Sequence, residues 1–224
     1  MKLYPLNKIV LALHNNPSQF LNGLTSNSLD KPANAFLNIH GRIIATFDQL
    51  KVNDNEFLIV IEKQFLEAVL QHIDRYVRLA GVKVEQLSTQ VYFDLEGNVP
   101  TQTNDYVVPQ KVGRLIITTQ ELSANVSAEE FTLFRLKNNI PAHGIDYMDE
   151  FLLNVSEVDA VSFTKGCFLG QEPVSKVHNR SRPSWKLVVR YENECSDEEK
   201  QKMTSKVIDR ATQRTLGFVF VKNE

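Results

Sequence analysis

The stretch that decides the fold is AFLNIHGRIIATFDQLKVNDNEFLIVI, residues 35–61. Its apolar runs at 35–39, 43–52 and 57–61 each have the length of a strand, and HGR and NDNE separate them. Gly41 can adopt the left-handed backbone conformation that a tight turn often needs. We therefore expect three consecutive antiparallel strands joined by two hairpin turns.

The segments on both sides extend this pattern. KIVLAL (8–13) is a short apolar strand, and after Pro17 the segment SQFLNGL places its apolar side chains on one face of a helix. EKQFLEAVLQHIDRYV (62–77) has the spacing of an amphipathic helix, and VKVEQL (82–87) forms a further strand. The order βαβββαβ predicts an α+β fold with a largely antiparallel sheet backed by helices.

The second half predicts shorter elements. Strands are expected at QVYFDL, DYVVP, RLIITT, VSF (161–163), WKLVVRY (185–191) and LGFVFV (216–221). Ser127 and Glu130 form a capping box that opens a helix, which must end before Pro141. We expect a body over 1–184, with subregions of about 1–90 and 91–184, and a reduced β-barrel-like segment over 185–224.

The composition is that of a globular protein. The chain has 224 residues, 42% of them hydrophobic and 23% charged, with a net charge of −2. No overall basic charge points to nucleic acid, and no apolar run is long enough to span a membrane. Two cysteines make neither a disulfide framework nor a metal-ligand pattern. We expect a cytoplasmic protein without a metal site.

The chemistry of the chain centres on KGCFLGQEPVSKVHNR, residues 165–180. Residue type alone favours a buried, inert Cys167. If CFLGQE begins a helix, however, Cys167 lies near its positive end beside Lys165, which are conditions that favour a reactive thiolate. A nucleophilic pair of Cys167 with His178 has no distinctive spacing, so His178 is better interpreted as a surface residue.

A cluster of basic residues follows the same motif. Five basic residues lie between 176 and 190 with no acidic residue among them, and Trp185 interrupts the series. This pattern occurs in nucleic-acid patches. Because the whole chain is mildly acidic, we favour a solvated face or a site for a small polyanion, such as a polyglutamate tail.

KGCFLGQE resembles the K-G-C-aromatic-x-G-Q-E signature of the YgfZ family, the folate-binding relatives of the glycine-cleavage T protein that act in iron–sulfur cluster maintenance. FLNGLTSNSL (20–29), HGRIIATF (40–47) and RLKNNIP (135–141), which precedes DAVSFTKGC, resemble further segments of that family. The resemblance implies a T-protein-like α+β body with a central folate-sized cavity, followed by a small β-barrel.

The resemblance also implies a set of site residues. Cys167 would be the reactive thiol and Lys165 would stabilise its thiolate. Gln171 and Glu172 would orient the turn or a ligand, or act only as a structural cap. The motif-supporting residues are Gly166, Gly170, Gln171 and Glu172, and the residues expected to contact tetrahydrofolate are Asn27, Arg42, Phe131, Arg135 and Arg180. Phe131 is otherwise a core residue.

Three departures from the family pattern bear on the chemistry. Ala45 and Thr46 stand where an aminomethyltransferase has an Asp-Asp pair, and neither supplies a carboxylate. Asp48 is expected on the opposite face of the strand. Lys137 replaces a glutamate that would recognise the pterin ring, and Ser28 replaces an aspartate.

The leading hypothesis is a YgfZ-like tetrahydrofolate-binding protein that supports iron–sulfur cluster assembly or repair through Cys167. Its partners would be folate and iron–sulfur client or assembly proteins. One alternative is a folate-dependent aminomethyl transferase, against which the uncharged Ala45-Thr46 pair argues. The second alternative is a non-catalytic adaptor that retains the fold, which Lys137 and the short tail favour.

Overall fold

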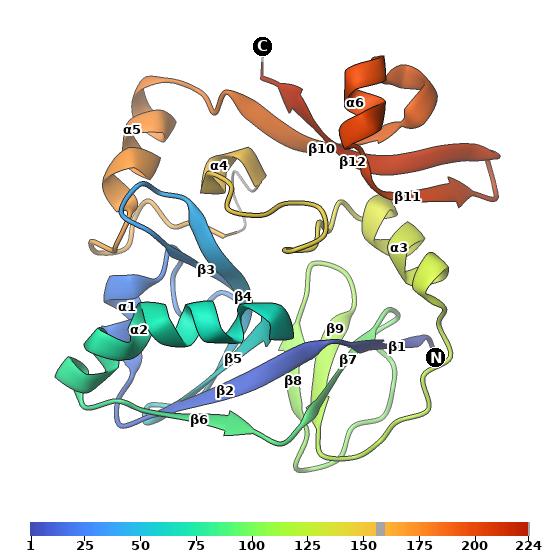
Figure 1. The fold of residues 1–224 in the computed structure, drawn as a ribbon. Helices are drawn as coiled ribbons and strands as arrows, with labels where there is room; N and C mark the ends of the chain where they lie inside the picture. The colour runs from blue at the N-terminus through green and yellow to red at the C-terminus, as the bar shows by residue number, and fades with distance from the viewer. Residues whose placement is uncertain (156–159, 224) are drawn as a thin grey trace.

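A computed structural model of the chain describes residues 1–155 and 160–223. It is a mixed α+β fold with three antiparallel sheets (Figure 1). The largest sheet has the order β3-β4-β5-β2-β6, and two helices, α1 and α2, pack on it. Its elements are β2 (Lys8–His14), α1 (Ser18–Leu24), β3 (Ala33–Leu37), β4 (Ile43–Asn53), β5 (Glu56–Glu62), α2 (Leu66–Ala80) and β6 (Lys83–Leu87).

The central strands β2 and β5 are buried on both faces. They pair antiparallel over their full length, from Lys8 opposite Glu62 to His14 opposite Glu56. Leu11 and Ile59 pack under α1 and α2, whereas the alternate side chains, such as Val10 and Val60, pack against the four-stranded sheet. This two-sided burial is the reason that KIVLAL and FLIVI are continuous apolar runs instead of alternating ones.

The helix α2 confirms the predicted amphipathic segment. A short 3-10 turn, η1 (Lys63–Phe65), precedes it, and Val69 and Ile73 are buried against the sheet. Gly81 ends the helix in the left-handed conformation at φ 67°, as helix-ending glycines commonly do. No helix in the described ranges is long and apolar enough to cross a membrane.

The four-stranded sheet has the order β1-β7-β9-β8. Its strands are β1 (Leu3–Leu6), β7 (Gln90–Asp94), β8 (Tyr106–Pro109) and β9 (Arg114–Thr118). The sequence predicted all of these except β1, because Pro5 interrupts LYPL. Since β1 is an edge strand, the missing amide hydrogen of Pro5 is tolerated there.

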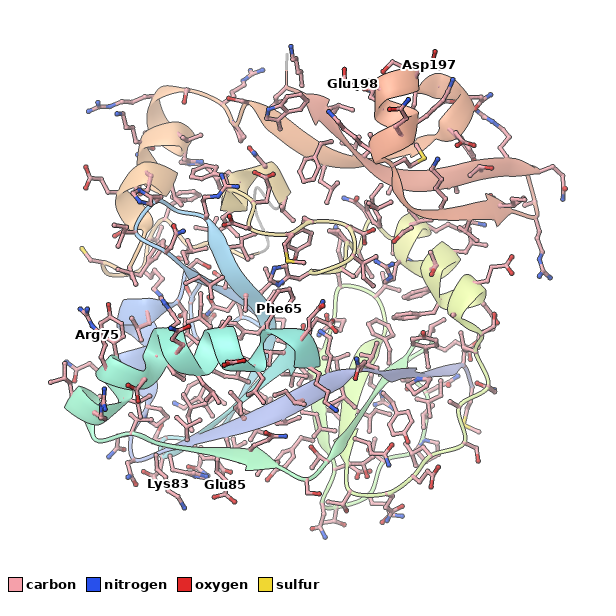
Figure 2. All side chains as sticks on the ribbon, viewed as in Figure 1. Phe65, Arg75, Lys83, Glu85, Asp197 and Glu198 are labelled. Atoms are coloured by element: carbon pink, nitrogen blue, oxygen red, sulfur yellow. The ribbon has the colours of Figure 1, made fainter. Side chains whose placement is uncertain are left out.

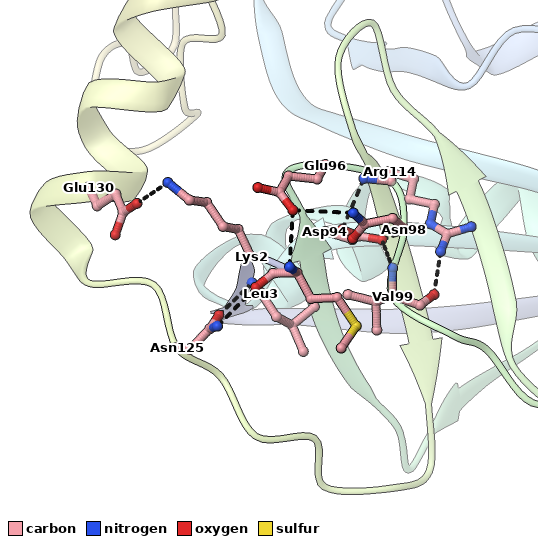
Figure 3. Close-up of polar contacts among 11 residues, drawn as sticks. Lys2, Leu3, Asp94, Glu96, Asn98, Val99, Arg114, Asn125 and Glu130 are labelled. Atoms are coloured by element: carbon pink, nitrogen blue, oxygen red, sulfur yellow. Dashed lines mark hydrogen bonds and ion pairs between the residues drawn. The ribbon is translucent and has the colours of Figure 1, made fainter.

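A buried carboxylate organises the loop that follows β7 (Figure 3). Asp94 is fully buried and accepts hydrogen bonds from the backbone amides of Gly97 at 3.0 Å and Val99 at 2.9 Å. Arg114 pairs with the same carboxylate at 3.0 Å and also donates to the carbonyl of Val99. Burial alone would raise the pKa of Asp94, but these hydrogen bonds and Arg114 lower it.

The last part of the chain forms helices and a third sheet. After α3 (Ala128–Lys137) come α4 (Leu152–Val155), α5 (Gln171–Arg180), β10 (Trp185–Tyr191), η2 (Glu192–Glu194), α6 (Asp197–Lys202), β11 (Thr204–Asp209) and β12 (Arg214–Lys222). The sheet order is β10-β12-β11, with α6 packed on β12. This is an open three-stranded sheet, so the expected barrel-like closure is absent from the described residues.

Three local predictions need correction. VSF (161–163) is not a strand, because its backbone turns toward the 25–27 segment instead of pairing in a sheet. The capping box of α3 is incomplete: Ser127 accepts from the amide of Glu130 at 3.1 Å, while the Glu130 carboxylate pairs with Lys2. The polar link after β10 contains α6, which a complete capping box at Ser196 and Glu199 opens.

Replacing Asp94 with alanine should lower the free energy of unfolding by about 3 kcal/mol, since Arg114 and two amides lose a buried partner. Urea unfolding measures this, with Lys2→Ala, which removes an exposed ion pair, as a nearly neutral control. Because the folded pKa of Asp94 is lowered, the difference from wild type should be full above about pH 4 and shrink as the pH falls further. A difference that is independent of pH down to about 2 would contradict this assignment.

Candidate functional site

The loop that carries Cys167, residues 161–170, is hydrogen-bonded at its start to the segment that follows α1. The amide of Ser162 donates to the carbonyl of Ser26 at 3.0 Å. The ammonium group of Lys165 donates to the carbonyls of Thr25 at 2.6 Å and Asn27 at 3.0 Å. Lys165 therefore fastens the loop to the 25–27 segment. The segment DAVSFTKGC, which was quoted with the family resemblance, starts at Asp159, and this residue lies outside the described residues.

The loop is also fixed on the other side of Cys167. The amide of Leu169 donates to the carbonyl of Gly23 at 3.0 Å. Gly170 has φ 82°, and a Cβ there would clash with the carbonyl oxygen of Asn38 at the tip of the β3–β4 hairpin. Cys167 itself is exposed. The result is a thiol that is presented to solvent at the apex of a loop held at both ends.

The helix expected at the motif begins later than predicted. α5 starts at Gln171, with Gly170 as its N-cap, so Cys167 is outside the first turn and the helix-end argument for a thiolate does not apply. The interpretation of Cys167 as a core residue is also wrong, since the side chain is exposed. The structure shows an accessible thiol on a loop that hydrogen bonds hold on both sides.

Lys165 differs from its expected role. Among the described residues its hydrogen bonds go to backbone carbonyls and none goes to Cys167. Its ammonium group also lies 5.2 Å from the centre of the Phe168 ring. Burial lowers the pKa of Lys165 to about 8. The lysine of the motif is therefore a half-buried fastening group of the loop.

The remaining motif residues have unequal roles. Gly166 has open space around it, whereas Gly170 is required by its backbone conformation and its neighbour. Gln171 and Glu172 form the first turn of α5, and neither side chain makes a hydrogen bond within the described part of the chain. The predicted structural cap is thus not formed by these side chains.

The end of α5 carries the other polar residues of the motif. The His178 side chain is exposed, which agrees with its interpretation as a surface residue. Its ring stacks on Phe163 with a centroid distance of 3.7 Å. Arg180, the last residue of the helix, is exposed.

Two residues expected at a folate site belong to the core. Phe131 is buried and stacks on Tyr4 at 4.1 Å. Arg135 is 6% exposed and pairs with Asp146 at 2.7 Å, and it also donates to the Ser205 hydroxyl at 2.8 Å. Arg135 therefore ties α3 to the C-terminal sheet, which a pattern local to the helix could not indicate.

The other expected folate contacts are also engaged with the protein. Asn27 is buried, where its amide side chain donates to the carbonyl of Ala33 at 2.9 Å. Arg42 is exposed and pairs with Asp149 at 3.2 Å. Lys137, the residue that departs from the family pattern, pairs with Asp209 at 3.1 Å. Asn27 therefore fixes the segment between α1 and the start of β3, and Arg42 remains on the surface.

A cluster of polar side chains lies at one end of the face of the five-stranded sheet that packs against the four-stranded sheet. Lys8 lies 2.9 Å from the carboxylate of Asp48 and 3.5 Å from that of Glu62. Gln110, after β8, donates to Asp48 at 3.0 Å, and the hydroxyls of Thr46 and Tyr147 are 2.7 Å apart. We call the following residues the interior polar cluster: Lys8, Thr46, Asp48, Glu62, His143 and Tyr147.

The position of Asp48 corrects one prediction. Side chains alternate along β4, and Ala45 packs on the helix side of the sheet. Asp48 is indeed on the opposite face from Ala45, but it shares its face with Thr46. A carboxylate is therefore present near the position expected to lack one, although Lys8 neutralises it.

Burial and pairing set the charges of the cluster. Burial opposes a charge on Lys8, but Asp48 and Glu62 outweigh it and raise the pKa of the lysine. Burial raises the pKa of Glu62, and Lys8 offsets part of that effect. Burial also raises the pKa of Tyr147, so its hydroxyl stays protonated. The cluster thus holds a charged lysine beside a neutral phenol.

Sequence reasoning did not identify His143. Its ring lies between two aromatic rings, 3.8 Å from Phe65 and 5.0 Å from Tyr147. Phe65 lies at the start of α2, at the end of the helix toward the middle of the view (Figure 2). A histidine on an irregular segment after Pro141 gives no periodic signal, so only the fold could bring these rings together.

Two surface pockets lie away from both places. One, of about 520 Å³, is lined by residues that include Tyr92 and Leu122. The other, of about 380 Å³, includes Trp185 and Lys222, whose ammonium lies 5.9 Å from the Trp185 ring centre. Neither pocket is lined by Cys167 or by the interior polar cluster.

The sequence comparisons give a distant relative. No protein-family model matches the chain. The chain is 24% identical over 147 residues to an uncharacterized protein from Haemophilus influenzae, and the match covers 62% of this chain and 52% of that protein. The chain thus spans about half the length of this curated relative.

The comparison with solved structures identifies the fold. The crystal structure of glycine cleavage system aminomethyltransferase T from Bartonella henselae matches with a TM-score of 0.78 at 12% sequence identity. The match covers 99% of this chain and 78% of that one. The chain therefore has a T-protein-like fold, as its antiparallel sheets and backing helices indicate.

The two glycines of KGCFLGQE provide a test of the loop. Gly170→Ala should lower the free energy of unfolding by about 2 kcal/mol, because alanine is strained at φ 82° and its Cβ meets the Asn38 carbonyl. Gly166→Ala is the matched control and should be nearly neutral, since its Cβ points into open space. Thermal and urea unfolding measure both. Equal losses for the two variants would contradict the described loop.

Proposed function

We propose that this chain is a tetrahydrofolate-binding protein of the YgfZ type that supports iron–sulfur cluster assembly or repair through the thiol of Cys167. The observation that carries the proposal is the exposed Cys167 at the apex of a loop fastened by Lys165 and Gly170. The motif KGCFLGQE and the T-protein-like fold support it.

The chemistry of one exposed thiol limits the part it can take. A cluster normally needs four ligands, so Cys167 can supply one of them at most. Cys195 does not supply a second ligand, because its thiol is buried. Burial and the charge of Glu199 also raise the pKa of this thiol. Cys167 would therefore act on a partner's iron–sulfur site together with thiols from that partner. Iron–sulfur client or assembly proteins are the partners that this requires.

The fold supports a folate ligand. The Bartonella henselae protein is named as an aminomethyltransferase, and 99% of this chain matches 78% of that protein in fold. The interior polar cluster offers the imidazole of His143 and the hydroxyls of Thr46 and Tyr147 beside a sheet face that is otherwise apolar. Arg180 and Arg42 remain on the surface for the carboxylates of a folate tail.

The transferase alternative has less support from the geometry. Asp48 shares a face with Thr46, but Lys8 at 2.9 Å and Gln110 at 3.0 Å already occupy its oxygens. A carboxylate held in this way is poorly suited to activate a one-carbon carrier. An assay for tetrahydrofolate-dependent methylene release separates the two, since the proposed function predicts no turnover.

The proposal predicts different effects for the two cysteines. In a deletion strain, Cys167→Ser should fail to restore the activity of iron–sulfur enzymes, because serine is a far weaker nucleophile and metal ligand than cysteine. Cys195→Ser is the matched control and should restore that activity at comparable protein levels, since its thiol is buried. Enzyme activity in cell extracts measures both. Full restoration by Cys167→Ser would overturn the proposal.

A further inference from the structure

His143 is a buried histidine whose polar atoms have no partner. Its side chain is 4% exposed, and neither ring nitrogen makes a hydrogen bond within the described part of the chain. Leaving a buried polar atom unpaired costs about 1–3 kcal/mol, so native structures rarely leave two on one ring without a reason. Water or a bound ligand would supply the hydrogen bonds that these nitrogens lack within the described chain.

The His143 ring is stacked between two aromatic side chains. Phe65 and Tyr147 cover its two faces, with interplanar angles of 6° and 15°. The amide of Gly144 donates to the carbonyl of Tyr147 at 2.8 Å, which closes the turn beside His143. Gly144 also approaches Gln64 so closely that a Cβ would clash with that side chain. The stacking thus fixes the plane of the His143 ring.

The charge state of His143 limits what it can bind. Burial, and to a smaller extent the nearby charge of Lys8, lower its pKa to about 4. At neutral pH the imidazole is uncharged and offers one N–H donor and one acceptor nitrogen. Such a group does not select an anionic tail by charge. It suits a neutral heterocycle that itself carries both donors and acceptors.

His72 shows what a merely structural histidine of this chain is like. It lies on α2 against Phe36 and Tyr76, is partly exposed, and has only its Nε2 atom buried and unpaired. Its ring contacts within the described chain are with Phe36 and Tyr76, neither of which belongs to the interior polar cluster. His143, in contrast, lies beside the hydroxyl pair of Thr46 and Tyr147.

We propose that His143 is a ligand-binding residue, whose ring nitrogens hydrogen-bond the neutral heterocyclic ring of a bound pterin or a chemically similar ligand. This inference rests on the proposed function for the choice of a folate. The ligand ring that His143 would contact is defined by its hydrogen-bonding groups, and not by the rest of the folate molecule. The amino-oxo-pyrimidine edge is common to pterins and guanine, so a guanine nucleoside presents the same donors and acceptors without being a folate.

Calorimetric titration of the full chain with 5-formyltetrahydrofolate and with guanosine tests the inference. The variants are His143→Phe, which keeps an aromatic ring between Phe65 and Tyr147, and His72→Phe as the matched control. We expect His143→Phe to weaken binding about tenfold for each probe that the wild type binds, and His72→Phe to leave it unchanged. Thermal unfolding of the unliganded variants checks that both are folded.

The outcomes separate the inference from the proposed function. If the wild type binds the folate and His143→Phe binds it equally well, the inference is overturned while the folate proposal stands. If the wild type binds guanosine but not the folate, with the expected loss in His143→Phe, the inference stands and the folate proposal fails. Binding of neither probe overturns the inference, and the nitrogens of His143 are then hydrated. Should His143→Phe not fold, the ¹⁵N resonances of the wild-type imidazole replace it: a shift on probe addition supports the inference, and no shift overturns it.

Discussion

The burial of β2 and β5 on both faces is the constraint on which the rest of the structure depends. One face packs under α1 and α2, and the other packs against the four-stranded sheet. Because the interior on both sides is apolar, burying a polar side chain there costs free energy unless it is paired or hydrogen-bonded. Lys8 and Glu62, which face each other at one end of this strand pair, meet that condition together with Asp48.

Local patterns in the sequence predict most of the body. The hairpins at 35–61 and the helix α2 follow from apolar spacing and turn residues, and they form as expected. Two strands depart from a regular strand pattern. Pro5 interrupts β1, and the pairing of β11 with β12 shifts register between Thr204 and Val207. The open C-terminal sheet depends on how α6 and β11 fill the segment after β10. The Ser196–Glu199 capping box marks the start of α6, but no short pattern specifies how β11 pairs with β12.

The candidate site was less predictable because its contacts join distant parts of the chain. Lys165 reaches the carbonyl of Thr25, and Arg135 reaches Ser205. A motif indicates that such residues matter, but it does not show whether they bind a ligand or fasten a loop. His143 lacked any signal of its own, since its setting requires Phe65 and Tyr147 to meet in the fold.

The proposed function uses two places with different chemistry, the surface thiol of Cys167 and the interior polar cluster. The central claim is that Cys167 is the accessible thiol, so the rate of alkylation of each cysteine in the native chain tests it most directly. Iodoacetamide labelling followed by peptide mass spectrometry should show rapid modification of Cys167, with Cys195 protected until the chain unfolds. Native labelling of Cys195 at the rate of Cys167, or protection of Cys167, would contradict the account.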